Sequence, residues 1–314
     1  MALFPLAVLR TDVGVVRARN EDAAHVDERG RFAIVADGMG GHGAGDVAST
    51  MAVALVRASL EAEAALLVSY ASEPTLAGRT LLAARMRTAV ERANAEVFDR
   101  SEREPDKHQM GSTLEVVLLA GNEAFIAHVG DSRTYLIRHG RAAQLTVDHT
   151  VAETMRRAGA MSDEEAGVSE MRSVLSNAIG VTPTVTVDLL RVELRSGDRL
   201  LVCSDGLHEY FTREQLAHQA SAGDPDAALS RMLAHARDGG GHDNITGVII
   251  ELRTRPAATA PPLPTIDPLD DQPTNPVPYP VERPAGGPLE GVGDETLKHF
   301  LDQTLRESSR HRLP

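Results

Sequence analysis

Short apolar runs rich in Val, Ile and Leu recur between residues 5 and 252 and predict β-strands. Some of these runs follow one another after only a few residues, too few for a helical crossover, so neighbouring strands must pair antiparallel. This arrangement favours an α+β layered fold over a doubly wound one. The runs lie at about 5–10, 31–36, 113–120, 123–129, 133–138, 185–194, 198–203 and 245–252.

The segment 80–98 has the period of an amphipathic helix. Its charged residues point away from a single apolar stripe, so we expect this helix to lie on the outside of a sheet. The stripe consists of Leu82, Met86, Val90, Ala93 and Val97.

The apolar pattern ends near Arg253. Residues 254–293 contain eleven of the seventeen prolines and predict an extended, disordered linker. Beyond it, apolar residues at helical spacing predict a short amphipathic helix and tail over 294–314. Two roles stay open for this helix: packing back on its own domain, or docking on a partner. We therefore expect one globular domain over 1–253.

Charge and cysteine content argue against a nucleic-acid-binding protein and against a protein stabilised by disulfides. The net charge is −13 over 314 residues, and no basic patch is visible, which argues against a nucleic-acid partner. The single cysteine, Cys203, excludes an internal disulfide and suits a reducing compartment. The apolar start has no basic region before it, so we interpret it as a first strand rather than a signal peptide. We expect a cytoplasmic protein without a membrane span.

Five glycines between residues 38 and 45 follow one predicted strand and precede a helix. Gly38, Gly40 and Gly43 match a dinucleotide-binding G-x-G-x-x-G spacing. However, Asp37 closes the strand, and its carboxylate would repel a pyrophosphate. The acidic residue expected after a second strand is also missing, because Glu61 follows a helical run. A dinucleotide site is therefore the weaker interpretation.

Acidic residues stand beside strand ends and glycines at several further points. Each one alone is more often a turn or cap residue. Together they can converge at one rim, where ionised carboxylates need a counter-charge. Oxygen donors without a matching His or Cys set favour Mg²⁺ or Mn²⁺ over zinc. The residues are Asp37, Asp131, Asp205 and Asp243, with Glu21 and Asp22 as a further pair.

Seven blocks in order along residues 5–252 closely resemble the metal-dependent Ser/Thr protein phosphatases of type 2C, in their bacterial form. The resemblance implies a β-sandwich of two antiparallel sheets flanked by helices on both sides, with two metal ions at one end. The blocks are VRARNED, VADGMGGHGAG, GSTLEVV, AHVGDSRTYLI, LTVDHT, LLVCSDGL and GHDNITGVII.

The resemblance also implies a set of metal ligands. Asp37 would bridge two Mn²⁺ or Mg²⁺ ions, Asp205 and Asp243 would complete one of them, and the Gly38 carbonyl would bind the other. The spacing of glycines around Asp37 agrees with a close approach of backbone to an ion. Asp131, together with Asp205, corresponds to a third metal site in bacterial members.

Four other residues receive roles from the same resemblance. Glu21 and Asp22 would hold metal-bound waters, and Arg17 would grip the substrate phosphate. We assign Asn244 a supporting role. Met39 stands where better-known relatives have a histidine often assigned as general acid, and a thioether cannot donate a proton.

The function implied is hydrolysis of phosphoserine and phosphothreonine by a hydroxide that bridges two metal ions. The expected partners are phosphoproteins and a Ser/Thr kinase that the enzyme opposes, and we expect a monomer. Residues 150–180 correspond to the family's flap beside the active site. At the flap's base, Asp148 and His149 are expected to serve as a turn and a helix cap.

Two further functions compete with this prediction. A cysteine-based phosphatase would use Cys203 as its nucleophile, but it needs an arginine six positions later, where this chain has Glu209. A catalytically silent docking module of the same fold would lack metal ligands, yet the complete acidic set is present. The phosphatase is therefore the prediction, with the docking module as its alternative.

Overall fold

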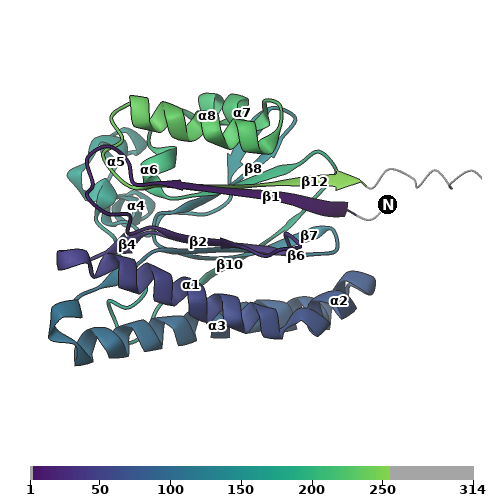
Figure 1. Ribbon diagram of the computed structural model, residues 1–314, viewed down its shortest axis with the longest axis horizontal. Helices are drawn as coiled ribbons and strands as arrows, with labels where there is room; N and C mark the ends of the chain where they lie inside the picture. The colour runs from purple at the N-terminus through teal and green to yellow at the C-terminus, as the bar shows by residue number, and fades with distance from the viewer. Residues whose placement is uncertain (1–2, 255–314) are drawn as a thin grey trace, which may run out of the picture. The chain divides into compact units, whose positions relative to one another are not determined.

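A computed structural model describes residues 3–254. Two five-stranded antiparallel sheets lie face to face in this part of the chain (Figure 1). The first sheet has the order β1 (Leu3–Asp12), β12 (Ile245–Thr254), β11 (Arg199–Cys203), β8 (Arg133–Arg138), β9 (Arg141–Gln144). The second has the order β10 (Asp188–Glu193), β7 (Glu123–Val129), β6 (Leu114–Ala120), β3 (Phe32–Ala36), β2 (Ala23–Val26).

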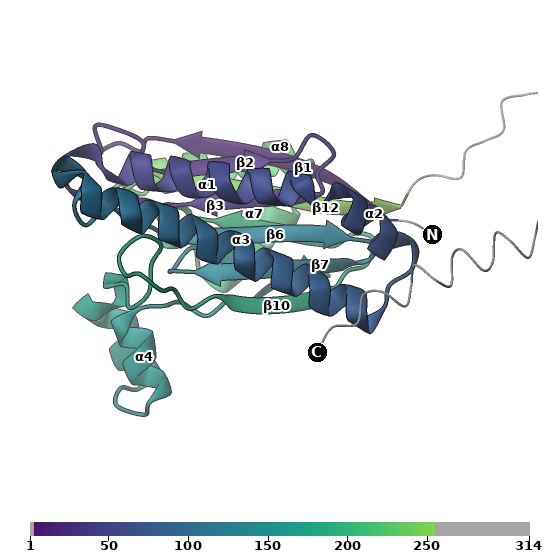
Figure 2. The ribbon, with the colours of Figure 1, turned by 90° about the horizontal axis from the view of Figure 1, so that it is seen from below.

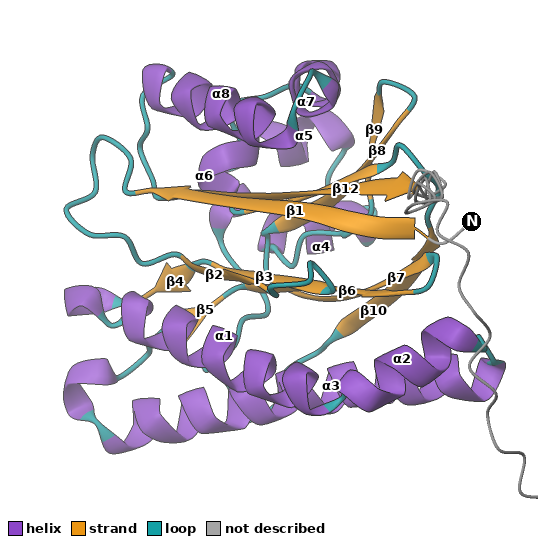
Figure 3. Ribbon diagram, turned by 45° about the vertical axis from the view of Figure 1, so that its right-hand side comes forward, coloured by secondary structure: helices purple, strands orange, loops and turns teal. Residues whose placement is uncertain are grey.

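Helices cover the outer face of each sheet, which gives four layers (Figure 3). The second sheet is covered by α1 (Gly45–Ala62), α2 (Ala64–Ser72) and α3 (Leu76–Arg103), and Figure 2 shows α1 and α3 side by side across it. The first sheet is covered by α7 (Arg213–Ser221) and α8 (Pro225–Asp238). The short elements are β4 (Gly38–Met39), β5 (Gly111–Ser112), α4 (Val151–Arg157), α5 (Asp163–Val168), α6 (Asp205–His208), and 3-10 turns at Gly41–Gly43, Pro105–Lys107 and Glu170–Ser173.

Apolar side chains fill all three spaces between the layers. Leu200, Val202 and Val248 pack between the two sheets, where they meet residues of β3 and β6. The predicted stripe of the long helix α3 is buried against α1 and the second sheet. A third cluster joins α7 and α8 to the first sheet. Because both faces of each central strand are covered, these strands are apolar throughout rather than alternating.

The first and last strands pair along their whole length. Leu3 lies opposite Thr254, and Asp12 lies opposite Ile245. The loop that follows Asp12 and the loop that precedes Ile245 therefore leave the sheet side by side, although more than 200 residues separate them in the sequence. This pairing places the segment containing Arg17 beside the segment containing Asp243.

The predicted fold is confirmed, and all eight predicted strands are present with shifts of a few residues at their ends. The very short strands β2, β4, β5 and β9 were not predicted. The predicted linker beyond Thr254 and the helix over 294–314 lie outside the described residues. Within residues 3–254 the helices are too short or too polar to cross a bilayer.

Candidate active site

Four aspartates come from strand ends that meet at one rim of the sandwich. Asp37 follows β3, Asp131 follows β7, and Asp205 begins α6, with one residue between it and the end of β11. Asp243 lies two residues before β12. The antiparallel pairing alternates strand directions, so the ends of some strands and the start of another share this rim.

A cleft of about 330 Å³ opens at this rim. It brings together eight of the nine predicted site residues: Arg17, Glu21, Asp37, Gly38, Asp131, Asp205, Asp243 and Asn244. The ninth, Asp22, is not among the lining residues. Its carboxylate accepts a hydrogen bond of 3.0 Å from the Ser204 hydroxyl, directly before Asp205.

Burial and mutual repulsion make this cluster electrostatically unfavourable. Burial, with Asp22, Asp205 and Asp131 nearby, raises the pKa of Asp37 well above its ordinary value. Burial likewise raises the pKa of Asp22 and of Asp131 to about 7, and that of Asp205 to about 6. One carboxylate oxygen of Asp22 and one of Asp205 are buried with no hydrogen-bond partner.

Divalent cations fit this donor set. Orphaned carboxylate oxygens and neighbouring like charges are relieved by a hard cation, which prefers oxygen ligands. Within residues 3–254 no three acidic, His or Cys side chains already stand in a coordinating arrangement. Asp243 instead forms an ion pair with Arg17, with 2.7 Å between the carboxylate oxygen and the guanidinium nitrogen. A cation at Asp243 would therefore compete with this ion pair.

The glycine at position 38 allows three backbone segments to meet beside Asp37. A Cβ there would lie 2.1 Å from the Gly45 carbonyl oxygen and 2.5 Å from that of Glu21. The Glu21 carbonyl also accepts hydrogen bonds from the Gly38 amide at 3.2 Å and from the Ser49 hydroxyl at 2.6 Å. The glycine-rich loop thus serves close backbone packing at the rim.

Asn244 fixes the Arg17 loop to the start of β12. Its side-chain oxygen accepts a 2.7 Å hydrogen bond from the Glu21 amide. Its side-chain nitrogen donates to the carbonyls of Val13 and Arg19, both at 2.9 Å. A single buried amide therefore satisfies three backbone groups at the two ends of the loop, which agrees with the supporting role predicted for it.

Backbone and side-chain hydrogen bonds hold the loop that carries Asp131. Thr113 shares a 2.8 Å hydrogen bond with Ser132 and accepts another, 2.9 Å long, from the Asp37 amide. On the other side, the His149 amide donates to the Gly130 carbonyl at 2.7 Å. Thr113 therefore couples the loops of two predicted metal ligands, and the sequence reasoning assigned it no role.

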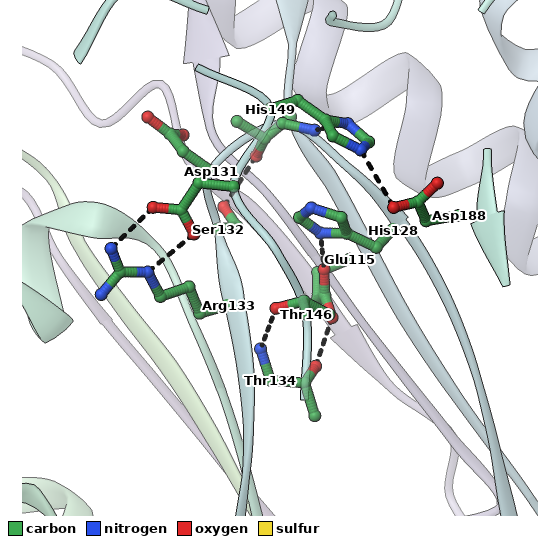
Figure 4. Close-up of polar contacts among 12 residues, drawn as sticks. Glu115, His128, Asp131, Ser132, Arg133, Thr134, Thr146, His149 and Asp188 are labelled. Carbon is green, nitrogen blue, oxygen red and sulfur yellow. Dashed lines mark hydrogen bonds and ion pairs between the residues drawn. The ribbon is translucent and has the colours of Figure 1, made fainter. Parts of the chain in front are cut away.

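Below this loop lies a buried polar network (Figure 4). His128 contacts Glu115 through Nδ1 at 2.6 Å and the Val147 carbonyl through Nε2 at 2.9 Å. The carbonyl can only accept, so Nε2 carries a proton. Burial alone would lower the pKa of His128, but the Glu115 carboxylate raises it overall. The rings of His128 and His149 are 4.6 Å apart.

The prediction of a turn and cap by Asp148 and His149 is wrong. Thr150 caps α4, and its side chain accepts a 3.2 Å hydrogen bond from the Glu153 amide. Asp148 instead forms a two-pronged ion pair with Arg133, at 2.8 and 2.6 Å. The carboxylate is committed to a guanidinium on β8 and is not free to cap a helix.

The flap segment reaches the cleft, as predicted. Ser173 and Leu175 line it, and no sequence signal singled them out. Arg172 of the same segment bonds Glu209 beyond α6 at 2.7 Å. A neighbouring pocket of about 380 Å³ lies between the flap and the body, and Asp131 and Asp205 line both spaces.

The structure also places Cys203 and Met39, the two residues considered as a nucleophile and at the position of a general acid. Cys203 is fully buried, and burial raises the pKa of its thiol, so it is unsuited to act as a nucleophile. Met39 lines the cleft beside Gly38. The acidic cluster and Arg17 are therefore the charged groups that line the cleft.

Comparison with known proteins decides the family. A family model described as Protein phosphatase 2C matches residues 15–242. The chain belongs to the protein phosphatase 2C family. Its similarity to named members of protein phosphatase 2C is strong: PstP of Mycobacterium tuberculosis, a serine/threonine protein phosphatase, is 37% identical over 246 residues. That match covers 77% of this chain but 44% of PstP, so the chain aligns with less than half of that protein.

A second relative aligns over nearly its whole length. The serine/threonine phosphatase stp of Listeria monocytogenes is 36% identical over 252 residues, which cover 78% of this chain and 95% of that protein. Among solved structures, the PstP catalytic domain in complex with two manganese ions has a TM-score of 0.67 at 34% identity, covering 80% of this chain and all of that one. The protein phosphatase 2C sandwich inferred from the sequence is thereby confirmed.

Proposed function

We propose that residues 1–253 form a metal-dependent catalytic domain that hydrolyses phosphoserine and phosphothreonine in proteins. The observation that carries this proposal is the cleft in which Asp37, Asp131, Asp205 and Asp243 converge beside Arg17. The names of the relatives and the family membership support the same activity. The buried carboxylate oxygens without hydrogen-bond partners support a requirement for cations in this site.

Asp37, Asp205 and Asp243, with the Gly38 carbonyl, would hold two Mn²⁺ or Mg²⁺ ions. Glu21 and Asp22 would support these ions through water, and Asp131 would form a third site with Asp205. When bound, the cations supply hydroxide near neutral pH and offset the charge of the phosphate. The structure of the PstP catalytic domain in complex with two manganese ions supports this assignment.

Arg17 would bind the phosphate of the substrate. In the described state its guanidinium pairs with Asp243 at 2.7 Å and is about half exposed. Cation binding to Asp243 would release Arg17, which then offers its planar fork to two phosphate oxygens. Because Met39 cannot donate a proton, water in the cleft would protonate the leaving serine or threonine oxygen.

The substrates would be phosphoproteins made by a Ser/Thr kinase of the same cell, which the enzyme opposes. A cytoplasmic, monomeric enzyme suits this role. The single cysteine and its burial are compatible with a reducing compartment.

The test is hydrolysis of a phosphothreonine peptide by the full chain with Mn²⁺, with Mg²⁺ and with a chelator. We expect metal-dependent turnover that chelation abolishes. Arg17→Ala should lower kcat/KM by about a hundredfold, because one charged fork contributes roughly 3 kcal/mol in such a site. Arg10→Ala, which removes a paired arginine on β1, is the matched control. A folded protein without turnover in either metal would contradict the proposal and favour a silent docking module.

A further inference from the structure

A second cleft adjoins the catalytic cleft and shares Arg17 with it. It measures about 460 Å³, and its charged lining residues are Arg17, Arg19 and Glu21. Gly40, Gly43, Ala18 and Asn244 complete it. Arg17, Glu21, Gly40 and Asn244 also line the catalytic cleft, so the two spaces are contiguous. A polypeptide whose phosphate reaches Arg17 would extend naturally into this second cleft.

Arg19 differs from Arg17 in having no salt-bridge partner. Within residues 3–254 its guanidinium makes no ion pair, whereas Arg17 is paired with Asp243. Asn244 holds the Arg19 carbonyl in place at 2.9 Å, so the backbone beneath this exposed side chain is fixed. The position is therefore anchored while the charge remains available.

The last glycine of the loop makes room for this arginine. Gly43 has a φ of +77°, and a Cβ there would lie 2.8 Å from Nη1 of Arg19. Any other residue would be strained at this φ and would push the guanidinium away. Gly43 thus allows Arg19 to rest against the wall of the second cleft.

We propose that Arg19 is a specificity-determining residue that favours substrates with an anionic side chain close to the phosphorylated residue. This inference rests on the proposed phosphatase function and names the class of substrate for the same site. Arg17 and Arg19 are two positions apart, and an extended peptide advances about 3.3 Å per residue. The anionic side chain should therefore stand one to three residues from the phosphoresidue.

The chemistry of the guanidinium admits two kinds of anion. A carboxylate and a second phosphate both match its planar fork, and the phosphate carries more charge. Glu21 is the acidic residue that lines this cleft. When a cation binds in the neighbouring site, the Glu21 carboxylate would interact with it through a bound water. Because the whole chain is strongly negative, at −13, an arginine without an ion pair beside the site provides local attraction for an anionic side chain.

The experiment uses the full chain with Mn²⁺ and a set of phosphothreonine peptides. The peptides carry Glu, Gln or a second phosphoserine at one, two or three positions on either side of the phosphothreonine. For the wild type we expect kcat/KM to be about two- to fivefold higher for the best Glu peptide than for its Gln counterpart, as for an exposed ion pair. The kcat/KM of the doubly phosphorylated peptide should exceed that of the Gln peptide by a larger factor. The preference should decline as salt screens the charges.

Variants isolate the contribution of Arg19. Arg19→Gln should bring the Glu-to-Gln ratio close to one, and Arg19→Lys should keep part of it because the charge remains. The matched control is Arg141→Gln, which removes an exposed arginine at the tip of the β8–β9 hairpin and makes the same change in net charge. This control should keep the wild-type ratio. Equal ratios in wild type and Arg19→Gln would overturn the inference.

Binding separates this inference from the proposed function. The same peptides with a non-hydrolysable phosphonate are titrated by fluorescence anisotropy, which requires no turnover. Binding that favours Glu in wild type but not in Arg19→Gln, without hydrolysis of any phosphopeptide, would leave the inference standing and refute the phosphatase. Hydrolysis without any charge preference would refute the inference and leave the phosphatase standing. Binding without preference, in the absence of turnover, would refute both.

Discussion

Two polar regions near the same rim of the sandwich solve the problem of buried charge in opposite ways. In the first, Glu115 and His128 are fully buried, and both nitrogens of the histidine have partners. In the second, Asp37 and Asp205 crowd together, and one oxygen of Asp205 has no partner. The charges of the first region are paired within the chain, whereas the carboxylates of the second are crowded and incompletely paired.

This difference distinguishes polar groups that stabilise the fold from polar groups that are expected to bind a ligand. A buried polar group that is fully paired contributes to a unique fold, whereas one left unpaired costs stability unless a ligand compensates for it. The carboxylate cluster is therefore retained at a cost to the fold, as expected of a binding site. Variants in the two regions should consequently affect different measurements.

The largest effect should come from Asp205→Asn, which removes a candidate metal ligand. We expect kcat/KM to fall on the order of a thousandfold, because cation chemistry supplies the nucleophile. In a chelator the variant should be at least as stable as the wild type, since a carboxylate with an unpartnered oxygen has been removed. Peptide hydrolysis and thermal melting measure these two properties.

Mn²⁺ sharpens this test. At about a hundred times its dissociation constant, the ion should stabilise the wild type by about 3 kcal/mol per site, and it should stabilise Asp205→Asn by less. Asp226→Asn, which alters an exposed aspartate of α8 paired with Arg10, is the control and should retain both activity and the Mn²⁺ effect. A variant that melts much earlier in chelator would place Asp205 among the structural residues instead.

The next largest effect concerns stability. His128→Leu would leave the buried Glu115 without its charged partner and with the Thr134 hydroxyl alone, which should lower the free energy of unfolding by about 3–5 kcal/mol. Urea denaturation measures this change, with His218→Leu on the exposed face of α7 as the matched control. The kcat/KM per folded molecule should change by less than tenfold. A loss of activity as large as that of Asp205→Asn would break the distinction between the two regions.

A smaller effect is expected at Asp27, a carboxylate outside both regions that is paired with Arg31. Hydrogen bonds from Arg31, with burial opposing them, lower the pKa of Asp27 from 3.8 to about 2. A lowered pKa stabilises the fold fully above pH 4, and this contribution disappears as the pH falls from about 4 to about 2.

Asp27→Asn should therefore reduce the free energy of unfolding by about 2 kcal/mol at pH 7, with a smaller difference from wild type near pH 3. Urea titrations at the two pH values provide the comparison. A constant difference between wild type and variant would mean that the ion pair with Arg31 contributes nothing that depends on the charge of Asp27.

Much of the fold was predictable because its central strands are long and apolar. The run at 133–138 and the stripe on α3 carry their own signals, and each lies where the pattern put it. A two-residue strand such as β4 has no period to detect, because its pairing with β5 is decided by tertiary contacts. The pairing of β1 with β12 is equally invisible to a local pattern.

The site divides in the same way. Aspartates beside glycines at strand ends were visible in sequence, so the acidic cluster was predictable as a group. Ser173 and Leu175 were not, since they reach the cleft only through the path of the flap. Asp148 was misjudged because its partner, Arg133, lies on a neighbouring strand, and sequence distance gives no sign of their ion pair.

The pairing of β1 with β12 also dictates the order of events during protein synthesis. Because Leu3 needs Thr254 as its neighbour, the first sheet stays incomplete until the last strand has emerged from the ribosome. The Arg17 loop and the Asp243 loop come together only when β1 and β12 pair. A nascent chain interrupted before Ile245 would therefore carry most of its acidic residues but no finished active site.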